Sequence, residues 1–189
     1  AGASELSMAQ WSSFFAEKGL GISKIMGDLL GPCAFALFMG ISRMIHGIYG
    51  EKLSLKGSII VSATLGVVCY AVAGLSLNPI FALLGCAVCG FSVGIMWPGT
   101  LSLASRNFTH GGTAMFGILA MAGDLGCSLG PWLTGFVAEV TEKSRFVAEL
   151  TLKTGQEAEQ IAIKLGLLVG MIFPLFMVIS LIFNKKGDK

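Results

Sequence analysis

The longest uncharged stretch of this chain runs for 49 residues, from Gly57 to Ser105, without one Asp, Glu, Lys or Arg. A helix needs about 20 mostly apolar residues to cross the hydrocarbon core of a bilayer, so this stretch is long enough to cross it twice. In lipid, every backbone N–H and C=O group must be hydrogen-bonded within the protein, and this restricts spanning segments to helices and closed barrels. The length and uniform apolarity of the run predict transmembrane helices.

The composition of the whole chain agrees with a membrane protein. Its 189 residues are 54% hydrophobic and only 13% charged, whereas soluble domains average about 25% charged residues. Leu29–Ser42 and Leu165–Asn184 are also uncharged, and Asn107–Ala138 carries only Asp124. The sequence therefore predicts an all-α, polytopic transmembrane helix bundle surrounded by membrane lipid. A net charge of +2 without a basic patch argues against nucleic acid as a partner.

Glycines, prolines and charged links divide the chain into one partial and five full spans. The expected segments are a partial helix at 1–16, full spans at 25–48, 55–75, 79–105, 113–140 and 165–183, and an outward-facing charged loop at 141–164. Apolar residues within that loop suggest that its flanking helices extend into it. Because the chain opens in a semi-polar helical segment without an initiating Met, we expect it to be a piece of a longer protein.

The distribution of Lys and Arg predicts the orientation of these spans. The short links after the second and fourth spans and the C-terminus together carry seven cations and two acids: Arg43, Lys52, Lys56, Arg106, Lys185, Lys186 and Lys189, with Glu51 and Asp188. The opposite side carries six cations and six acids, mostly in the long loop. We therefore expect a cell (inner or plasma) membrane protein with a cytoplasmic C-terminus.

Three acids, Glu5, Asp28 and Asp124, fall at membrane depth rather than in a link. A charged side chain there costs about 3 kcal/mol or more, so such residues usually face a bundle interior or a wet cavity. Asp28 has the alternative of capping a helix near the outer surface, and Asp124 that of a hydrogen bond to a neighbouring helix. The three carboxylates are candidates for proton coupling or polar substrate contact.

The segments GDLLGP at Gly27–Pro32 and GDLGCSLGP at Gly123–Pro131 repeat an acid ahead of a Gly-Pro pair. Proline removes one backbone hydrogen bond and loosens a helix. The two segments occupy the second spans of two three-span groups that run in opposite senses across the membrane. This is the pattern of an inverted repeat, and substrate sites of transporters lie where such repeats meet.

Aromatic and amide side chains supply candidates for solute contact. Trp97, beside Pro98 in mid-span, is the best cavity candidate, while Trp11 and Trp132 fit either a solute site or an interfacial aromatic belt. Gln10, beside Trp11, offers the neutral donor and acceptor that a polyhydroxylated ligand needs. No metal-binding His pair, nucleophile with an adjacent base, or GxSxG elbow is present. We expect no enzyme activity, no cofactor and no metal.

The segment Gly40–Leu53, GISRMIHGIYGEKL, resembles the cytoplasmic signature loop of the major facilitator superfamily. Its pattern begins at Gly40, and Arg43, Gly47, Glu51 and Lys52 match the basic, glycine and acid-base positions, although the second basic cluster of the stricter motif is absent. AGASELSMAQW, GIMWPGTLSLA and MAGDLGCSLGP are similar to the seventh, tenth and eleventh helices of fucose-permease-like members.

The resemblance implies the C-terminal half of a twelve-helix transporter, a six-helix bundle of two inverted three-helix repeats whose partner is the missing N-terminal half. It implies alternating-access transport of a small polar solute, sugar-like or another metabolite, typically driven by a proton or other ion gradient through an intramembrane carboxylate. Glu5, Asp124 and then Asp28 would couple protons or bind substrate, and Gln10, Trp11 and Trp97 would contact the solute. The signature-loop residues would brace an inner gate. The alternative is a non-transporting, truncated helical module or regulatory half that pairs with another chain.

Overall fold

A computed structural model describes residues 1–183, apart from the side chains of Glu51 and Pro79. This part of the chain is helical, without a β-strand. Five segments are long and apolar enough to cross a membrane by length and composition: Lys24–Tyr49, Leu55–Leu75, Ile80–Asn107, Gly112–Glu142 and Ala158–Phe183. The predicted all-helical fold and membrane character are confirmed, while the six-helix major-facilitator arrangement stays a prediction.

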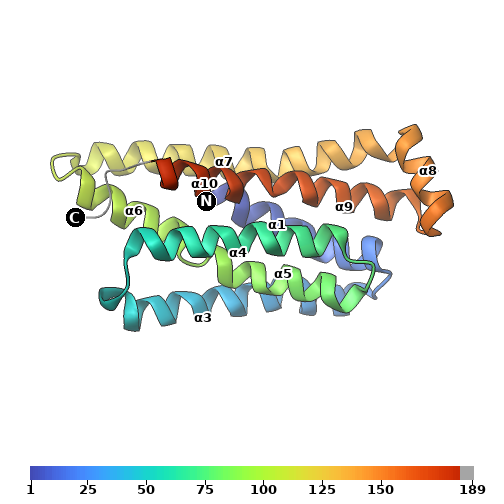
Figure 1. Ribbon diagram of the computed structural model, residues 1–189, viewed down its shortest axis with the longest axis horizontal. Helices are drawn as coiled ribbons and strands as arrows, with labels where there is room; N and C mark the ends of the chain where they lie inside the picture. The colour runs from blue at the N-terminus through green and yellow to red at the C-terminus, as the bar shows by residue number, and fades with distance from the viewer. Residues whose placement is uncertain (184–189) are drawn as a thin grey trace.

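The helices follow the predicted spans. In chain order they are α1 (Gly2–Phe14), the π-helix η1 (Phe15–Gly19), α2 (Lys24–Asp28), the π-helix η2 (Leu29–Cys33), α3 (Ala34–Tyr49), the 3₁₀ turn η3 (Gly50–Lys52), α4 (Leu55–Leu75), α5 (Pro79–Val93), α6 (Met96–Asn107), α7 (Gly112–Glu142), α8 (Arg145–Thr154), α9 (Ala158–Gly170) and α10 (Ile172–Phe183). The chain begins about midway along the bundle (Figure 1).

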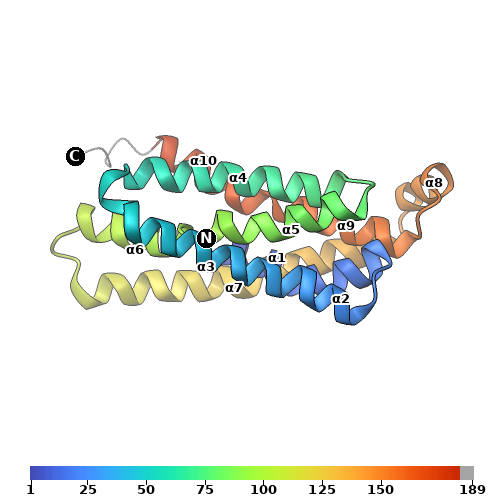
Figure 2. The same cartoon turned by 90° about the horizontal axis from the view of Figure 1, so that it is seen from below.

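The connections alternate between the two ends of the bundle. One end holds the α3–α4 and α6–α7 links and the end of α10, while the other holds the turns after η1 and α4 together with helix α8 (Figures 1 and 2). The two links predicted to be cytoplasmic therefore share one end, which we call the inner end. The side of the membrane that it faces stays a prediction, and Lys185, Lys186 and Lys189 lie outside the described residues.

Two predicted spans are interrupted close to a proline. The span expected at 79–105 divides into α5 and α6, and the last span divides into α9 and α10. Pro98 and Pro174 lack the N–H that would bond to the carbonyl four residues earlier, at Gly94 and Gly170. Helix α5 ends at Val93, directly before Gly94, and α9 ends at Gly170. Both interruptions therefore lie at the glycine of a Gly-x-x-x-Pro spacing.

The segment 141–164 differs from the expected loop. Helix α7 continues to Glu142, α8 forms a separate short helix, and α9 already begins at Ala158. The Ser144 hydroxyl accepts the Val147 N–H at 3.2 Å as an N-cap, and Gly155 ends α8 in the left-handed conformation with φ 68°. The extension of both flanking helices into this segment agrees with the expectation, whereas the separate helix α8 was not expected. It forms because the local caps are sufficient to start and stop a helix of ten residues.

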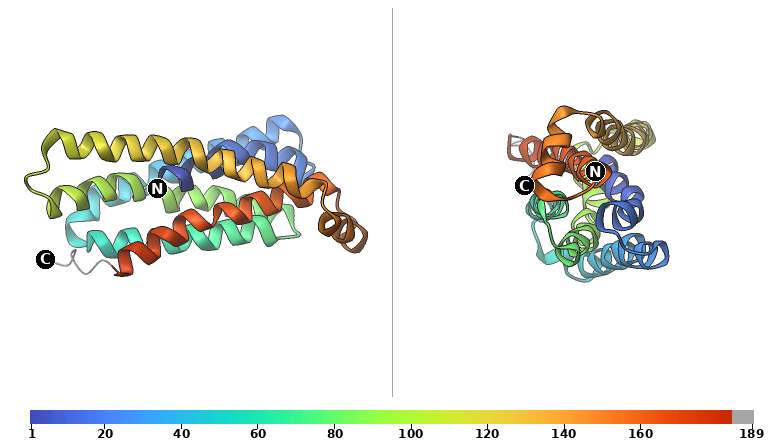
Figure 3. Two further views of the ribbon diagram at one scale, coloured as in Figure 1. Left: turned by 90° about the horizontal axis from the view of Figure 1, so that it is seen from above. Right: turned by 90° about the vertical axis from the view of Figure 1, so that its right-hand side faces the viewer.

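The interior of the bundle lies around α4, α5 and α9. Tyr70 of α4 is fully buried, and its hydroxyl donates to the Ser4 carbonyl of α1 at 2.8 Å. Met8 and Leu167 belong to the same apolar cluster. The end-on view shows α1 between α7 on one side and the α2–α3 segment on the other (Figure 3). The most apolar 18-residue window of the α5–α6 span is 67% buried, whereas that of α7 has no buried residue. The buried residues of α7 are Gly130, Pro131, Thr134 and Ala138, so the part of α7 before Gly130 forms an open flank of the bundle.

Candidate functional site

An acid and a base meet at the surface of the bundle between α1 and α3. Arg43 Nη2 lies 4.0 Å from Glu5 Oε2, and the two side chains are 47% and 23% exposed. Arg43 stands six residues before the end of α3, about 9 Å inside the helix at 1.5 Å per residue. Opposite charges at this depth reduce the penalty that either would carry alone. Arg43, counted with the cations of the inner side, thus lies within the span predicted at 25–48.

Besides the ion pair, a hydrogen bond fixes Arg43 on the break between α5 and α6. Its Nε donates to the Gly94 carbonyl at 3.3 Å. Because Pro98 supplies no N–H to that carbonyl, the guanidinium takes the place of the missing helical donor. The backbone interruption therefore creates an acceptor for Arg43, and the ion pair is tied to three helical segments.

Trp97 shares a cavity with Arg43 of the ion pair. A cavity of about 420 Å³ is lined by Arg43, His46, Gly47, Ile95, Trp97 and Pro98. A second cavity, of about 650 Å³, is also lined by Trp97 and extends along α1, α6, α7 and α10. The indole packs on Gly123 of α7, where an added Cβ would lie 2.6 Å from the Trp97 ring. The expectation of a cavity at Trp97 therefore agrees with the structure.

Asp124 follows Gly123 directly and is exposed on α7. Its backbone carbonyl accepts a hydrogen bond from the Ser128 hydroxyl, but its carboxylate has no hydrogen-bond or ion-pair partner among residues 1–183. The alternative of a hydrogen bond to a neighbouring helix is therefore not realised within the described part of the chain. Asp124 remains a candidate for a solute-facing or proton-coupling group.

Asp28 lies away from this group, nearer the opposite end of the bundle. It is the last residue of α2 and directly precedes η2, and its side chain makes no capping hydrogen bond to the first turn of η2. The capping alternative is therefore wrong. The exposed carboxylate of Asp28 accepts a hydrogen bond from the Ser13 hydroxyl of α1. Asp28 thus has a local partner that Asp124 lacks.

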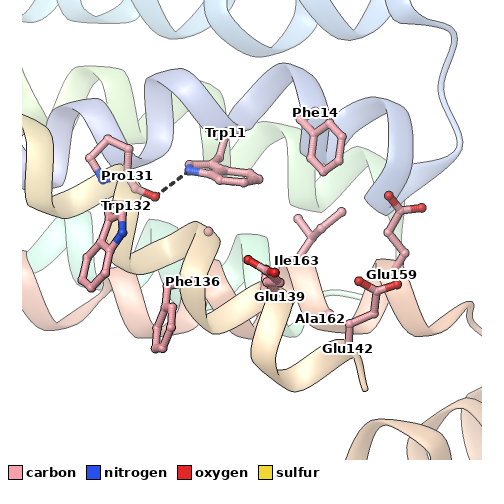
Figure 4. A pocket seen from close by; sticks show the side chains of 12 residues that line it. Trp11, Phe14, Pro131, Trp132, Phe136, Glu139, Glu142, Glu159, Ala162 and Ile163 are labelled. Atoms are coloured by element: carbon pink, nitrogen blue, oxygen red, sulfur yellow. Dashed lines mark hydrogen bonds between the residues drawn. The ribbon is translucent and has the colours of Figure 1, made fainter. Parts of the chain in front are cut away.

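Gln10 and Trp11 do not join the group around Trp97. Gln10 is exposed on α1. Trp11 Nε1 donates to the Pro131 carbonyl at 3.0 Å, and its ring faces a separate cavity between α1, α7 and α9 (Figure 4). No residue lines both this cavity and either cavity at Trp97. The expected set of solute-contacting residues is therefore divided between two places.

The signature-loop residues extend from the middle of α3 to the turn after it. Gly40 and Gly47 are exposed, with open space where a Cβ would stand. Lys52 is exposed in η3, and the side chain of Glu51 lies outside the described residues. The structure therefore places Arg43 and Gly47 at the cavity beside Trp97, and it leaves the bracing role of the motif a prediction.

Sequence reasoning missed Gly94 and Ser13 as partners of the candidate residues. The spacing Gly94–Pro98 was a usable signal, because proline always leaves the carbonyl four residues earlier without its helical donor. No such signal marked Ser13, which meets Asp28 across a turn. Comparison of the chain with protein-family models, curated proteins and solved structures gives no match.

Proposed function

We propose that this chain forms part of a secondary active transporter of the major-facilitator type, which moves a small polar, sugar-like solute by alternating access coupled to protons. The observation that carries the proposal is the Glu5–Arg43 pair beside the Trp97 cavity. A carboxylate paired with a cation can exchange that cation for a proton, which is the chemistry a proton-coupled carrier needs.

The roles of the residues follow from their contacts. Protonation of Glu5 removes its negative charge and leaves Arg43 bonded to the Gly94 carbonyl alone. Because that carbonyl lies at the α5–α6 break, a change at Glu5 reaches a flexible point of the bundle. Trp97 offers an aromatic face to the solute, and Asp124, the residue after the glycine that Trp97 packs on, offers a carboxylate without a partner among residues 1–183.

Exposed small and polar residues on the open flanks support a partner surface. Helix α3 exposes Ala36, Gly40, Arg43 and Gly47 on one face, and α7 exposes Thr113, Gly117, Ala120, Asp124 and Ser128 on one face. Lipid-facing helices are apolar, whereas small and polar residues favour close helix contact or a wet cavity. These faces suit a second six-helix half.

The same faces support the alternative function, a non-transporting helical module that pairs with another chain. The two functions differ in what the complete reading frame encodes. Six further spans that end just before Ala1 would favour the transporter, whereas a stop codon directly upstream would favour the module.

Transport is tested with the complete protein in proteoliposomes. A panel of neutral sugars and sugar acids is added under an imposed pH gradient, and a trapped dye reports proton movement. We expect solute-dependent proton entry, which Glu5→Gln reduces at least tenfold. The matched control is Glu149→Gln, an exposed acid on α8 away from the site. Proton entry that is absent for every solute, or that is unchanged in Glu5→Gln, would overturn the proposal.

A further inference from the structure

The cavity that contains Trp11 lies near the outer end of the bundle, remote from the proposed transport site. It encloses about 460 Å³ between α1, α7 and α9. Figure 4 shows indole and phenyl rings on one side of it and three carboxylates on the other. Its lining residues are Trp11, Phe14, Pro131, Trp132, Gly135, Phe136, Ala138, Glu139, Glu142, Glu159, Ala162 and Ile163.

The aromatic side of the cavity is held in place by specific contacts. Trp11 donates its indole N–H to the Pro131 carbonyl at 3.0 Å, and the ring lies so close to Gly135 that an added Cβ there would be 2.6 Å from Cζ2. Trp132 and Phe136, one helical turn apart on α7, stack with centroids 5.4 Å apart and an interplanar angle of 14°. The Trp11 ring is therefore held before any ligand arrives, and the stacked rings of Trp132 and Phe136 stand exposed beside it.

The other side of the cavity carries uncompensated negative charge. Glu139 and Glu142 come from the end of α7, and Glu159 comes from the first turn of α9. None of the three forms a salt bridge with a Lys, Arg or His among residues 1–183. Nor does any group of three His, Cys, Asp or Glu side chains within the described residues stand close enough to hold a metal ion. The charge is thus spread over a space larger than an inorganic cation.

We propose that this cavity binds an organic ammonium cation, with the cationic head against the rings of Trp11 and Trp132 and within reach of Glu139 and Glu159. Aromatic faces attract cations through the quadrupole of the ring, and they attract quaternary ammonium groups best because these are weakly hydrated. The carboxylates add a longer-range attraction that metal ions cannot use fully at this spacing. A free cation and the ammonium head group of a membrane lipid share this chemistry.

Choline and its neutral carbon isostere, 3,3-dimethyl-1-butanol, test the charge requirement. Binding of each is measured calorimetrically to the complete protein in nanodiscs of phosphatidylglycerol, which has no ammonium group. We expect saturable choline binding and none by the isostere. Repeating the titration in phosphatidylcholine nanodiscs identifies the source. Weaker choline binding there assigns the site to a lipid head group, and unchanged binding assigns it to a free cation.

Two substitutions and a control locate the binding in this cavity. Glu139→Gln and Trp132→Leu should each weaken choline binding about threefold to tenfold. Glu149→Gln, which neutralises an exposed acid outside the cavity, should leave it unchanged. The measurement is of binding alone, so it stands whether or not the protein transports a solute. The inference is overturned if choline does not bind, if the isostere binds equally well, or if both cavity variants bind as the wild type does.

Discussion

The two Gly-Pro segments have similar sequences but fold differently. In the first, Asp28 ends α2 and Pro32 lies within the π-helix η2. In the second, Asp124 and Pro131 both lie within the uninterrupted helix α7. A proline removes one helical N–H in either case, so the proline alone does not decide between a π-helical turn and a continuous helix. The acid stands four residues before the proline in the first segment and seven before it in the second.

What the segments share is their contact with α1. An added Cβ at Gly31 would stand 3.0 Å from the Ser12 carbonyl carbon, and one at Gly130 would stand 2.8 Å from Ala3 Cα and 2.6 Å from Ser7 Oγ. Each glycine before its proline therefore lets a helix approach the backbone of α1 closely. In both copies the glycine of the repeat makes a close helix contact with α1. The surroundings of the neighbouring acid, Asp28 or Asp124, differ between the two copies.

The largest difference is expected in transport. Asp124 has an exposed carboxylate with no partner in the described residues, whereas Asp28 accepts a hydrogen bond from Ser13. Asp124→Asn should reduce solute accumulation against a gradient at least tenfold and leave solute exchange partly intact. Asp28→Asn, which keeps an acceptor for Ser13, should retain most of the uptake. Radiolabelled uptake and counterflow in proteoliposomes measure both. Wild-type accumulation by Asp124→Asn would remove Asp124 from the coupling mechanism.

A smaller difference is expected in stability, from the closeness of the two helix contacts. Gly130→Ala places a methyl against the α1 backbone and should destabilise the protein by about 1–3 kcal/mol, because the close-packed backbone cannot move aside freely. Gly31→Ala meets slightly longer contacts, so its cost should be lower. Thermal unfolding in detergent, monitored by size-exclusion chromatography, shows which of the two variants is less stable.

Gly117→Ala is the matched control for that comparison. Gly117 lies in the same helix as Gly130, but nothing stands within 4 Å of its added Cβ. Alanine favours a helix over glycine, so this change should leave the unfolding temperature equal or raise it slightly. If Gly117→Ala and Gly130→Ala lower the unfolding temperature equally, close approach to α1 is not the reason for glycine at position 130.

The sequence predicted the number and placement of the long helices because apolar length is a strong signal in lipid. It did not predict the breaks within them, although Gly94–Pro98 and Gly170–Pro174 carried the information. Within 141–164 the sequence predicted the extension of the flanking helices but missed helix α8. The charges of this segment predict that it lies in water, but charge does not oppose helix formation where a Ser cap and a C-terminal Gly are present.

The sequence named the candidate residues but did not predict which of them lie together. Glu5, Trp97 and Asp124 stood out because polar and aromatic residues are rare in apolar spans. Which of these side chains meet depends on the rotation of each helix about its axis, and a single amino-acid sequence does not determine that rotation. Trp11 was therefore predicted to contact the solute together with Trp97, whereas its ring faces α7 and α9.

The smallest expected effect concerns the hydrogen bond that distinguishes the two acids. Ser13→Ala removes the donor to Asp28 and should cost about 0.5–1.5 kcal/mol of stability, in the range of hydrogen bonds between membrane helices. Asp28→Asn should cost less, and the double variant should cost less than the sum, because one interaction is removed in both. Ser128→Ala is the control, since Ser128 bonds only to a backbone carbonyl of its own helix. If the stability costs of Ser13→Ala and Asp28→Asn add strictly in the double variant, Ser13 does not stabilise Asp28. Asp28 and Asp124 would then differ only in position.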